Sequence, residues 1–325
     1  MSRHLALALL LTGCGARSSL STAAPVPAAE GAPASVILFG GLGSTPDGGD
    51  ADLGDTWVWT PASEWTQLHP GTSPSPRWGG TAATLGSSTV LFSVDASGGE
   101  TWIWDGTTWA QRMPGGSPPP PLISSVLVPL DGKLVLFAGY DHGVLYHDIW
   151  TWDGTSWTHE SPSVVPPARE APAGAVLGGS LVVFGGEDVN LEPLGDTWVY
   201  DGASWTQMAP THAPSPRRGA VAATLDGKVV LFGGDTIKNG GWASVNETWV
   251  WDGADWTQQH PAQSPDPRSF AGMAAAGGQV VLFGGGTFGG SYGDPAGTWA
   301  WDGTSWTESS GAGPSPRNGP AMAAR

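Results

Sequence analysis

Five arginines recur at one position of a repeated motif and could bind acidic ligands. Each ends a Pro-x-Pro-Arg sequence or a looser copy of it. The five are Arg77, Arg169, Arg217, Arg268 and Arg317. A guanidinium group can bind a carboxylate through two parallel hydrogen bonds, so this set could hold a carboxylated ligand. We therefore take the five arginines as candidate ligand-binding residues, and their pairing with acids of the chain itself is the alternative.

The repeats also supply acids that could neutralise most of these arginines. An acidic residue opens a tryptophan-containing segment at Asp55, Glu100, Asp148, Asp196 and Glu247. The order of the repeats predicts the ion pairs Arg77–Glu100, Arg169–Asp196, Arg217–Glu247 and Arg317–Asp55. Gly297 stands where the acid opposite Arg268 would be, and Pro121 stands in the place of a sixth arginine. Arg268 is therefore the arginine for which a structural ion pair is least expected.

Acidic and polar residues gather in the segments that follow the apolar repeats, and they could hold a cation. They are Asp47, Asp50 and Asp52; Asp141, His142, His147 and Asp148; and Glu187, Asp188 and Glu192. Oxygen ligands suit calcium, but residues 46–52 lack the spacing of an EF-hand loop. We expect a solvated acidic surface and no cofactor. Calcium binding and a metal or acid–base cluster over residues 141–148 are the alternatives, and His142 and His147 are candidate ligand-binding residues.

Two tryptophans and three tyrosines lie outside the repeated positions and could contact a ligand. They are Trp78, Trp242, Tyr140, Tyr146 and Tyr292. An aromatic ring on a polar loop can stack on a sugar or hold a peptide side chain. Trp242, in a glycine-rich segment, and Tyr140 are candidate ligand-binding residues. Trp78 adjoins an arginine, so it either binds a ligand or fills space between packed units.

The elements that must position these residues come from a unit that is repeated six times. An apolar run ending in phenylalanine recurs at Phe39, Phe92, Phe137, Phe184, Phe232 and Phe283. A Trp-x-Trp segment then begins at Trp57, Trp102, Trp150, Trp198, Trp249 and Trp299, with Tyr200 as the second aromatic of the fourth copy. One more tryptophan follows at Trp65, Trp109, Trp157, Trp205, Trp256 and Trp306. Because these positions hold every tryptophan except Trp78 and Trp242, we interpret the tryptophan excess as structural.

Each unit can be divided into four β-strands. In the fifth copy we expect strands over residues 219–225, 228–232, 247–252 and 255–259. Asp-Gly between the third and fourth strands favours a tight hairpin that sets two tryptophans opposite each other, as at Trp104 and Trp109. The second strand is apolar throughout, which is typical of a strand covered on both faces.

A four-stranded unit that recurs six times at about 48 residues resembles the kelch repeat. Residues 35–325 resemble a six-bladed kelch β-propeller, similar to the central domain of galactose oxidase, which implies an all-β fold with four antiparallel strands per blade. The chain enters at a second strand, 35–39, and ends with a first strand, 318–325, so we expect these two to pair and close the ring. The resemblance implies that the arginines begin the innermost strands, on the face that carries the long loops and binds ligands.

The N-terminal residues predict export and lipid attachment. Residues 1–13 hold a basic start and an apolar run too short to span a bilayer, which is typical of a signal peptide. Leu11-Thr12-Gly13-Cys14 resembles the lipobox of bacterial lipoproteins, which implies that Cys14, the single cysteine, carries lipid. Residues 14–34 then predict a flexible tether rich in alanine, proline and serine. We expect a protein anchored in the bacterial cell envelope, at the outer membrane because Gly15 follows the cysteine.

Composition and motifs narrow the function classes. The 325 residues include 29 acidic and 13 basic ones, for a net charge of −16, which argues against nucleic-acid binding. The chain has no nucleophile triad spacing, P-loop or HExxH motif, and its sole cysteine cannot build the copper site of galactose oxidase. We therefore expect a non-catalytic binding module for a protein, peptide or glycan. The alternative is a sugar-processing enzyme, because sialic-acid epimerases and sialidases share a six-bladed plan.

Overall fold

The computed structural model describes residues 34–44, 49–95, 98–113, 118–290 and 297–325. The predicted signal peptide, Cys14 and residues 14–33 of the predicted tether lie outside the described residues. Within the unit from Ala32 to Arg325, every regular element that is described is a β-strand. The described part of the chain contains no helix long and apolar enough to cross a membrane.

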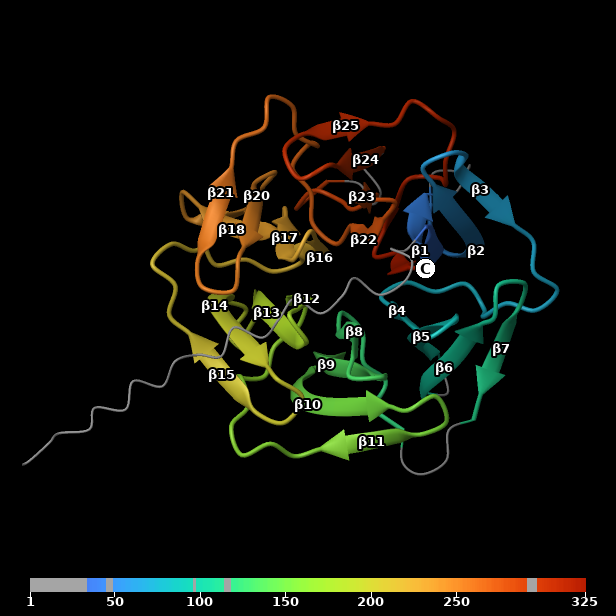
Figure 1. Ribbon diagram of the computed structural model, residues 1–325, viewed down its shortest axis with the longest axis horizontal. Helices are drawn as coiled ribbons and strands as arrows, with labels where there is room; N and C mark the ends of the chain where they lie inside the picture. The colour runs from blue at the N-terminus through green and yellow to red at the C-terminus, as the bar shows by residue number, and fades with distance from the viewer. Residues whose placement is uncertain (1–33, 45–48, 96–97, 114–117, 291–296) are drawn as a thin grey trace, which may run out of the picture. The chain divides into compact units, whose positions relative to one another are not determined.

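Six antiparallel sheets, called blades 1 to 6 here, surround a common centre (Figure 1). Blade 1 contains β27 (Ala321–Ala324) with β26 (Arg317–Asn318), then β1 (Val36–Ser44), β2 (Asp50–Thr60) and β3 (Glu64–Leu68). Blade 2 contains β4 (Thr81–Leu85), β5 (Ser88–Asp95), β6 (Gly98–Trp104) and β7 (Trp109–Arg112). Blade 3 contains β8 (Val126–Leu130), β9 (Lys133–Asp141), β10 (Val144–Trp152) and β11 (Trp157–Glu160).

The second half of the ring repeats this order. Blade 4 contains β12 (Ala173–Leu177), β13 (Ser180–Glu187), β14 (Pro193–Tyr200) and β15 (Trp205–Met208). Blade 5 contains β16 (Val221–Leu225), β17 (Lys228–Phe232), β20 (Thr248–Trp251) and β21 (Trp256–Gln259). Blade 6 contains β22 (Gly272–Ala276), β23 (Gln279–Phe283), β24 (Thr298–Trp301) and β25 (Trp306–Glu308). A separate two-stranded hairpin, β18 (Asp235–Lys238) and β19 (Gly241–Ser244), stands between β17 and β20 and was not predicted from the sequence.

The two ends of this unit close the ring, which confirms the predicted pairing. β27 pairs with β1 in antiparallel register, from Val36 opposite Ala324 to Phe39 opposite Ala321. The pairing continues past the strands, where Ser35 and Arg325 exchange two backbone hydrogen bonds of 3.0 and 2.8 Å. The innermost strands β4, β8, β12, β16, β22 and β27 contact one another in turn around the whole circle. Neither end of the unit therefore leaves an open sheet edge at the point of closure.

The hydrophobic core lies between the blades rather than inside any one of them. Each of six clusters of buried side chains combines residues from two neighbouring blades. The second strand of each blade lies in the middle, so Val36, Leu38 and Leu231 have no exposed surface. This confirms the interpretation of the apolar runs. Trp104 lies opposite Trp109 as predicted, with ring centroids 5.4 Å apart.

A side-chain hydrogen bond spans five of the six blade interfaces. The tryptophan of each fourth strand donates its Nε1–H to a buried threonine in the preceding blade. The pairs are Trp65–Thr298 (2.8 Å), Trp109–Thr56 (3.0 Å), Trp157–Thr101 (2.9 Å), Trp256–Thr197 (2.9 Å) and Trp306–Thr248 (2.8 Å). At the interface of blades 3 and 4, Ile149 occupies the threonine position, and Trp205 Nε1 has no hydrogen-bond partner among the described residues.

Six peptide groups form a closed ring of hydrogen bonds just before the innermost strands. The N–H of each residue donates to the carbonyl of its counterpart in the adjacent blade, at 2.8–3.3 Å. The residues, in donor order, are Gly79, Gly319, Phe270, Gly219, Ala171 and Ser124, which donates back to Gly79. All six have positive φ, between 50° and 72°. Such a conformation is strained for Phe270, so the ring of peptides must hold it in place.

Candidate functional site

The arginines predicted as ligand-binding residues are buried inside the blades. Arg169 donates from both terminal nitrogens to the Asp196 carboxylate, at 2.7 and 2.9 Å, and Arg217 donates to Glu247 at 2.6 Å. Arg77 pairs with Glu100 and Arg317 pairs with Asp55. The four side chains retain at most 6% exposure. All four ion pairs are those that the repeat order predicted as the alternative to ligand binding.

Each of these arginines also fixes the link between two blades. Arg268 donates from Nε to the carbonyl of Asp266 at 3.1 Å and from Nη1 to the carbonyl of Gly284 at 3.1 Å, and it is buried like the others. The Arg268 carbonyl in turn lies where a side chain on Gly233 would begin, 2.3 Å from an ideal Cβ. Gly233 has a φ of +71°, which a residue with a side chain rarely adopts. In four of the six blades a Gly-Gly follows the apolar strand, and its first glycine makes room for the next arginine link in this way.

The buried ion pairs set the protonation of their acids. Burial alone would raise the pKa of Asp196, but the hydrogen bonds and positive charge of Arg169 outweigh it and lower the pKa. The same balance lowers the pKa values of Asp55 and Glu247. The carboxylates stay ionised and hold the guanidinium groups, which favours a structural role for these arginines. A ligand role for the five arginines stays a prediction, and for Arg77, Arg169, Arg217 and Arg317 it would require an acid of the chain to be displaced.

The sixth arginine position needs a correction. Glu170 bridges Glu187, Arg218 bridges Asp235, and Ile123 makes the same bridge with Tyr140. Since Glu170 and Arg218 directly follow an arginine, the residue before Ile123 holds the corresponding place. That residue is Leu122, which is 1% exposed, and not Pro121. The error arose because the third copy is rich in proline, so the motif could be aligned one residue too early.

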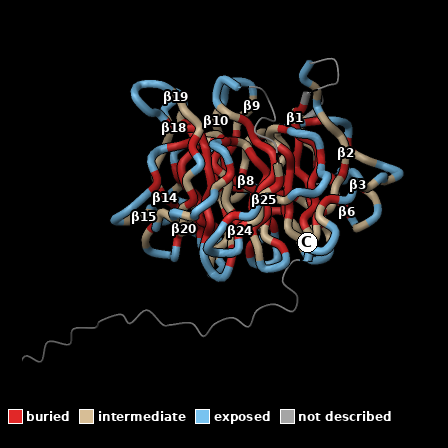
Figure 2. The backbone as a smooth tube through the Cα atoms, turned by 90° about the horizontal axis from the view of Figure 1, so that it is seen from above, coloured by how far each residue is buried: buried red, intermediate tan, exposed pale blue. Residues whose placement is uncertain are grey.

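One face of the propeller carries the longer connections, as the sequence predicted. The hairpins β1–β2, β9–β10 and β18–β19 extend toward the same side (Figure 2). Strands β1 and β2 stay paired beyond the blade until Ser44 lies opposite Asp50. Strands β9 and β10 do the same until Asp141 lies opposite Val144. The short Asp-Gly turns lie at the opposite ends of the strands. We call the side with the three hairpins the loop-rich face.

Trp242 belongs to an exposed aromatic group on this face. It lies on β19 opposite Ile237 of β18, and its ring stacks on Phe288 with centroids 5.9 Å apart and an angle of 28°. Ile237 is 43% and Phe288 48% exposed. We call these three residues the aromatic ledge. The sequence singled out Trp242 but missed Phe288, because a phenylalanine in a glycine-rich loop has no neighbour in the chain that reveals its stacking partner.

A charged group lies beside the aromatic ledge. The Arg218 guanidinium lies 4.7 Å from the centroid of the Trp242 ring, a cation–π contact. Arg218 Nη1 also lies 2.8 Å from Glu187 and 3.9 Å from Glu170. Burial raises the pKa values of both glutamates, and the charge of Arg218 only partly offsets this. Arg218 was missed in the sequence because it directly follows Arg217, which took the repeated position.

Asp235 joins the aromatic ledge to blade 6. It is 2% exposed and accepts hydrogen bonds from Ser244 Oγ at 2.6 Å and Ser269 Oγ at 2.9 Å. Ser244 Oγ also accepts the N–H of Phe288 at 2.8 Å. Burial raises the pKa of Asp235 against these hydrogen bonds. One buried carboxylate therefore holds both the hairpin that carries Trp242 and the loop that carries Phe288.

A comparison with protein families agrees with this architecture. The model of the KLHDC2/KLHL20/DRC7 kelch-repeats domain matches residues 32–234 and 163–265. This chain belongs to the kelch-repeat family. No curated protein matches it in sequence. The kelch blades account for the arginine links and the repeated tryptophans, including Trp57, Trp102 and Trp249, which donate to the acid two residues earlier. Trp198 does the same, whereas Trp150 and Trp299 have no such partner among the described residues.

The remaining candidates of the kelch loops lie apart from the aromatic ledge. His142 contacts Asp141 at the tip of β9–β10, while Asp148 binds His159 of β11 at 2.7 Å. The two His–Asp units do not form the single cluster that residues 141–148 suggested, and no group of metal ligands occurs among the described residues. His147 is exposed, and Tyr140 lies in the bridge to Ile123. Ligand binding by Tyr140, His142 and His147 stays a prediction.

Trp78 is 42% exposed, so it does not simply fill space between blades. It follows Arg77 as Arg218 follows Arg217, and an ideal Cβ on Gly319 would lie 3.8 Å from its ring. Trp78 therefore stands next to the ring of peptides, in a different part of the loop-rich face from Trp242. Its role in ligand binding stays a prediction.

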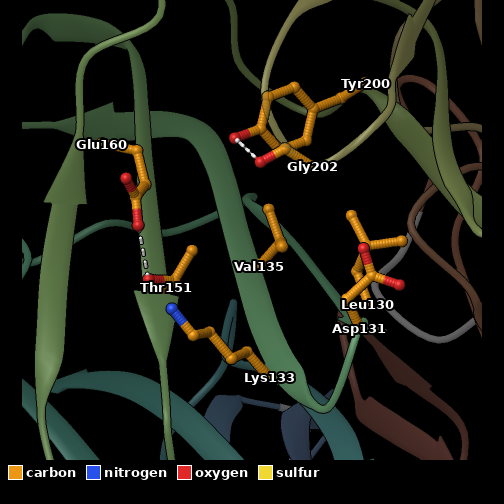
Figure 3. A pocket seen from close by; sticks show the side chains of 8 residues that line it. All are labelled: Leu130, Asp131, Lys133, Val135, Thr151, Glu160, Tyr200 and Gly202. Atoms are coloured by element: carbon orange, nitrogen blue, oxygen red, sulfur yellow. Dashed lines mark hydrogen bonds between the residues drawn. The ribbon is translucent and has the colours of Figure 1, made fainter.

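A small pocket of about 130 Å³ lies at the other end of the strands, between blades 3 and 4 (Figure 3). Its lining includes Lys133, Thr151 and Glu160 of blade 3 and Tyr200 of blade 4. Thr151 donates to Glu160 at 2.9 Å, and the Tyr200 hydroxyl donates to the Gly202 carbonyl at 3.0 Å. Thr151, Glu160 and the Tyr200 hydroxyl are thus engaged within the chain, and we assign no ligand to this pocket.

Proposed function

We propose that this kelch propeller is a non-catalytic binding module that holds a protein, peptide or glycan on its loop-rich face. The observation that carries the proposal is the aromatic ledge, where exposed Ile237 and Phe288 flank the half-buried Trp242 beside a charged group. Exposed aromatic residues on a rigid frame are typical of binding surfaces. The family supports such a role because the propeller is a scaffold whose loops vary independently of its core.

We further propose that the module is exported and held in the bacterial cell envelope through lipid on Cys14. Support comes from the resemblance of Leu11-Thr12-Gly13-Cys14 to a lipobox and from the composition of residues 14–34. Two or more acyl chains would anchor the chain stably. We expect mass spectrometry of the N-terminal peptide to find acylated Cys14, and the Cys14→Ser chain to leave the membrane fraction. An unmodified cysteine in a fully soluble protein would contradict the anchor.

The binding proposal is tested with the full chain carrying Cys14→Ser, applied to a glycan array and to an array of peptides. We expect retention of one ligand class, and loss of that retention in Phe288→Ala. Val164→Ala is the matched control, because Val164 is 51% exposed in the link between blades 3 and 4. Retention of nothing on either array, or equal retention by both variants, would contradict binding at this face.

The sugar-processing alternative draws no support from the site. Beyond the shared six-bladed plan, it would need the arginine set to bind a carboxylated sugar, and four of these arginines hold acids of the chain itself. A carboxylated sugar would have to compete with ion pairs that are already formed and desolvated. We therefore carry forward the binding module alone.

A further inference from the structure

The aromatic ledge is an exposed apolar surface with a fixed shape. Phe288 leaves 48% and Ile237 43% of their surface in solvent, while most large apolar residues of the described chain are buried. Exposed aromatic residues cost free energy that binding to a partner recovers. The aromatic ledge therefore points to a ligand with apolar side chains of its own.

Hydrogen bonds pre-organise the aromatic ledge before any ligand arrives. Asp235 holds Ser244 and Ser269, and Ser244 holds the backbone of Phe288, so hairpin β18–β19 and the loop of blade 6 form one unit. The ring of Trp242 is further held by Arg218 and Phe288. A surface that is already ordered loses little conformational entropy on binding, which favours affinity.

The charges next to the aromatic ledge are predominantly negative. Glu170, Glu187 and Asp235 lie around Arg218, whose guanidinium lies 2.8 Å from Glu187, and Lys238 of hairpin β18–β19 is a second cation. Glu187 is 1% exposed, and its Oε2 lies 2.8 Å from Arg218 Nη1. The next loop adds Asp188 and Glu192. The two cations Arg218 and Lys238 do not neutralise these five acids, so the surface favours a cationic ligand.

We propose that the aromatic ledge binds a basic segment of a partner protein, in which arginine or lysine alternates with apolar side chains. This proposal rests on the binding function proposed above and names its ligand class. The apolar side chains would pack on Trp242 and Phe288, and the basic groups would lie near Glu170 and Glu187. A second copy of this chain is a poor occupant, because each copy carries a net charge of −16 and the two surfaces would repel.

The test measures the affinity of a short fluorescein-labelled peptide of alternating arginine and leucine for the full Cys14→Ser chain by fluorescence anisotropy. We expect Phe288→Ala to weaken binding about tenfold through lost apolar contact. Glu170→Gln keeps the shape of the side chain and should weaken binding about threefold, with a smaller dependence on salt. Melting curves of each variant establish that it remains folded.

Two control variants and two control ligands decide the outcome. Val144→Ala removes an apolar residue that is 51% exposed on hairpin β9–β10 of blade 3, and Glu308→Gln removes an exposed acid on β25; both should bind as the parent does. Peptides with glutamate for arginine, or serine for leucine, should bind more weakly. Equal affinity of Phe288→Ala and Val144→Ala, or no binding of the basic peptide at all, would overturn the proposal.

The result also separates this proposal from the more general one. If the glutamate peptide or a neutral oligosaccharide binds best, and Phe288→Ala abolishes that binding, the loop-rich face is a binding site but its ligand class is not basic peptide. If the arrays find ligands whose retention is unaffected by Phe288→Ala, both the site and its ligand class are wrong.

Discussion

The interface between blades 3 and 4 differs from the other five interfaces and shows what a tryptophan–threonine hydrogen bond contributes. Elsewhere a threonine accepts the tryptophan Nε1–H, at 2.8–3.0 Å. Here Ile149 replaces the threonine, and Trp205 approaches Phe137 to 4.7 Å, against 5.2–5.6 Å for the equivalent ring pairs. Apolar packing has taken the place of one hydrogen bond without opening the ring.

Blade 3 departs from the others in its ion pair as well. Leu122 stands in the arginine position, and Asp148 binds His159 instead of an arginine. Tyr200 of blade 4 replaces a tryptophan, and the pocket of Figure 3 lies beside it. A propeller therefore tolerates one interface with different chemistry, because each interface contributes separately to a ring whose closure is shared.

The largest expected effect comes from making blade 5 resemble blade 3 at the arginine position. Arg217→Leu leaves the partly buried Glu247 without its cation and should lower the free energy of unfolding by about 3 kcal/mol. Urea denaturation measures the change. Adding Glu247→Gln should restore part of the loss, because the uncompensated charge is then removed. A loss below about 1 kcal/mol would show that the ion pair is dispensable in regular blades too.

The next effect concerns the hydrogen bond between blades 4 and 5. Thr197→Val keeps the side-chain shape but leaves the buried Nε1–H of Trp256 without an acceptor, at a cost of about 1–3 kcal/mol. Thermal and urea unfolding report the loss, with Thr206→Val on the exposed face of β15 as the control. If both variants unfold alike, the hydrogen bond adds nothing beyond the packing seen at Ile149.

The reverse substitution tests the exceptional interface itself. Ile149→Thr offers an acceptor to Trp205, which should gain about 1–2 kcal/mol, and removes apolar surface, which should cost about 1 kcal/mol. The net expectation is a stabilisation of up to about 1 kcal/mol, measured by urea unfolding. A clear destabilisation would show that the close Phe137–Trp205 contact is the better solution at this interface.

The smallest effect is a difference in acid sensitivity. Despite burial, hydrogen bonds and the charge of Arg217 lower the pKa of Glu247 below its ordinary value. The stabilising contribution of ionised Glu247 is therefore present above about pH 5 and is lost as the pH falls through the folded pKa. The double variant Arg217→Leu/Glu247→Gln should therefore lose less stability than the parent between neutral pH and pH 3, by up to about 1 kcal/mol after allowance for solvent screening. If the stabilities of the parent and the double variant fall in parallel with pH, ionised Glu247 does not stabilise the fold through Arg217.

The fold could be predicted from local patterns because most of them recur from one kelch blade to the next. Each pattern acts over a short stretch of chain: the apolar second strand recurs in all six copies, the Asp-Gly hairpin in five and the arginine–acid order in four. The exceptions were harder: Leu122 was missed because prolines surround it, and hairpin β18–β19 was missed because Asp235–Ser244 has weak apolar alternation. Of the aromatic ledge, Trp242 was predicted from the sequence and Phe288 was missed, because the two residues belong to different blades and meet only in the folded structure.

The periodic pattern, and the phase in which the repeat begins and ends, were enough to predict the six blades and the closure of β1 with β27. The same pattern matched the four arginines with their acids but left open whether they pair or bind a ligand. The folded structure was needed to show that they pair, that Arg218, Trp242 and Phe288 meet, and that six peptides join in a ring. These contacts depend on how neighbouring blades are rotated and packed. That geometry arises only when the whole circle is assembled.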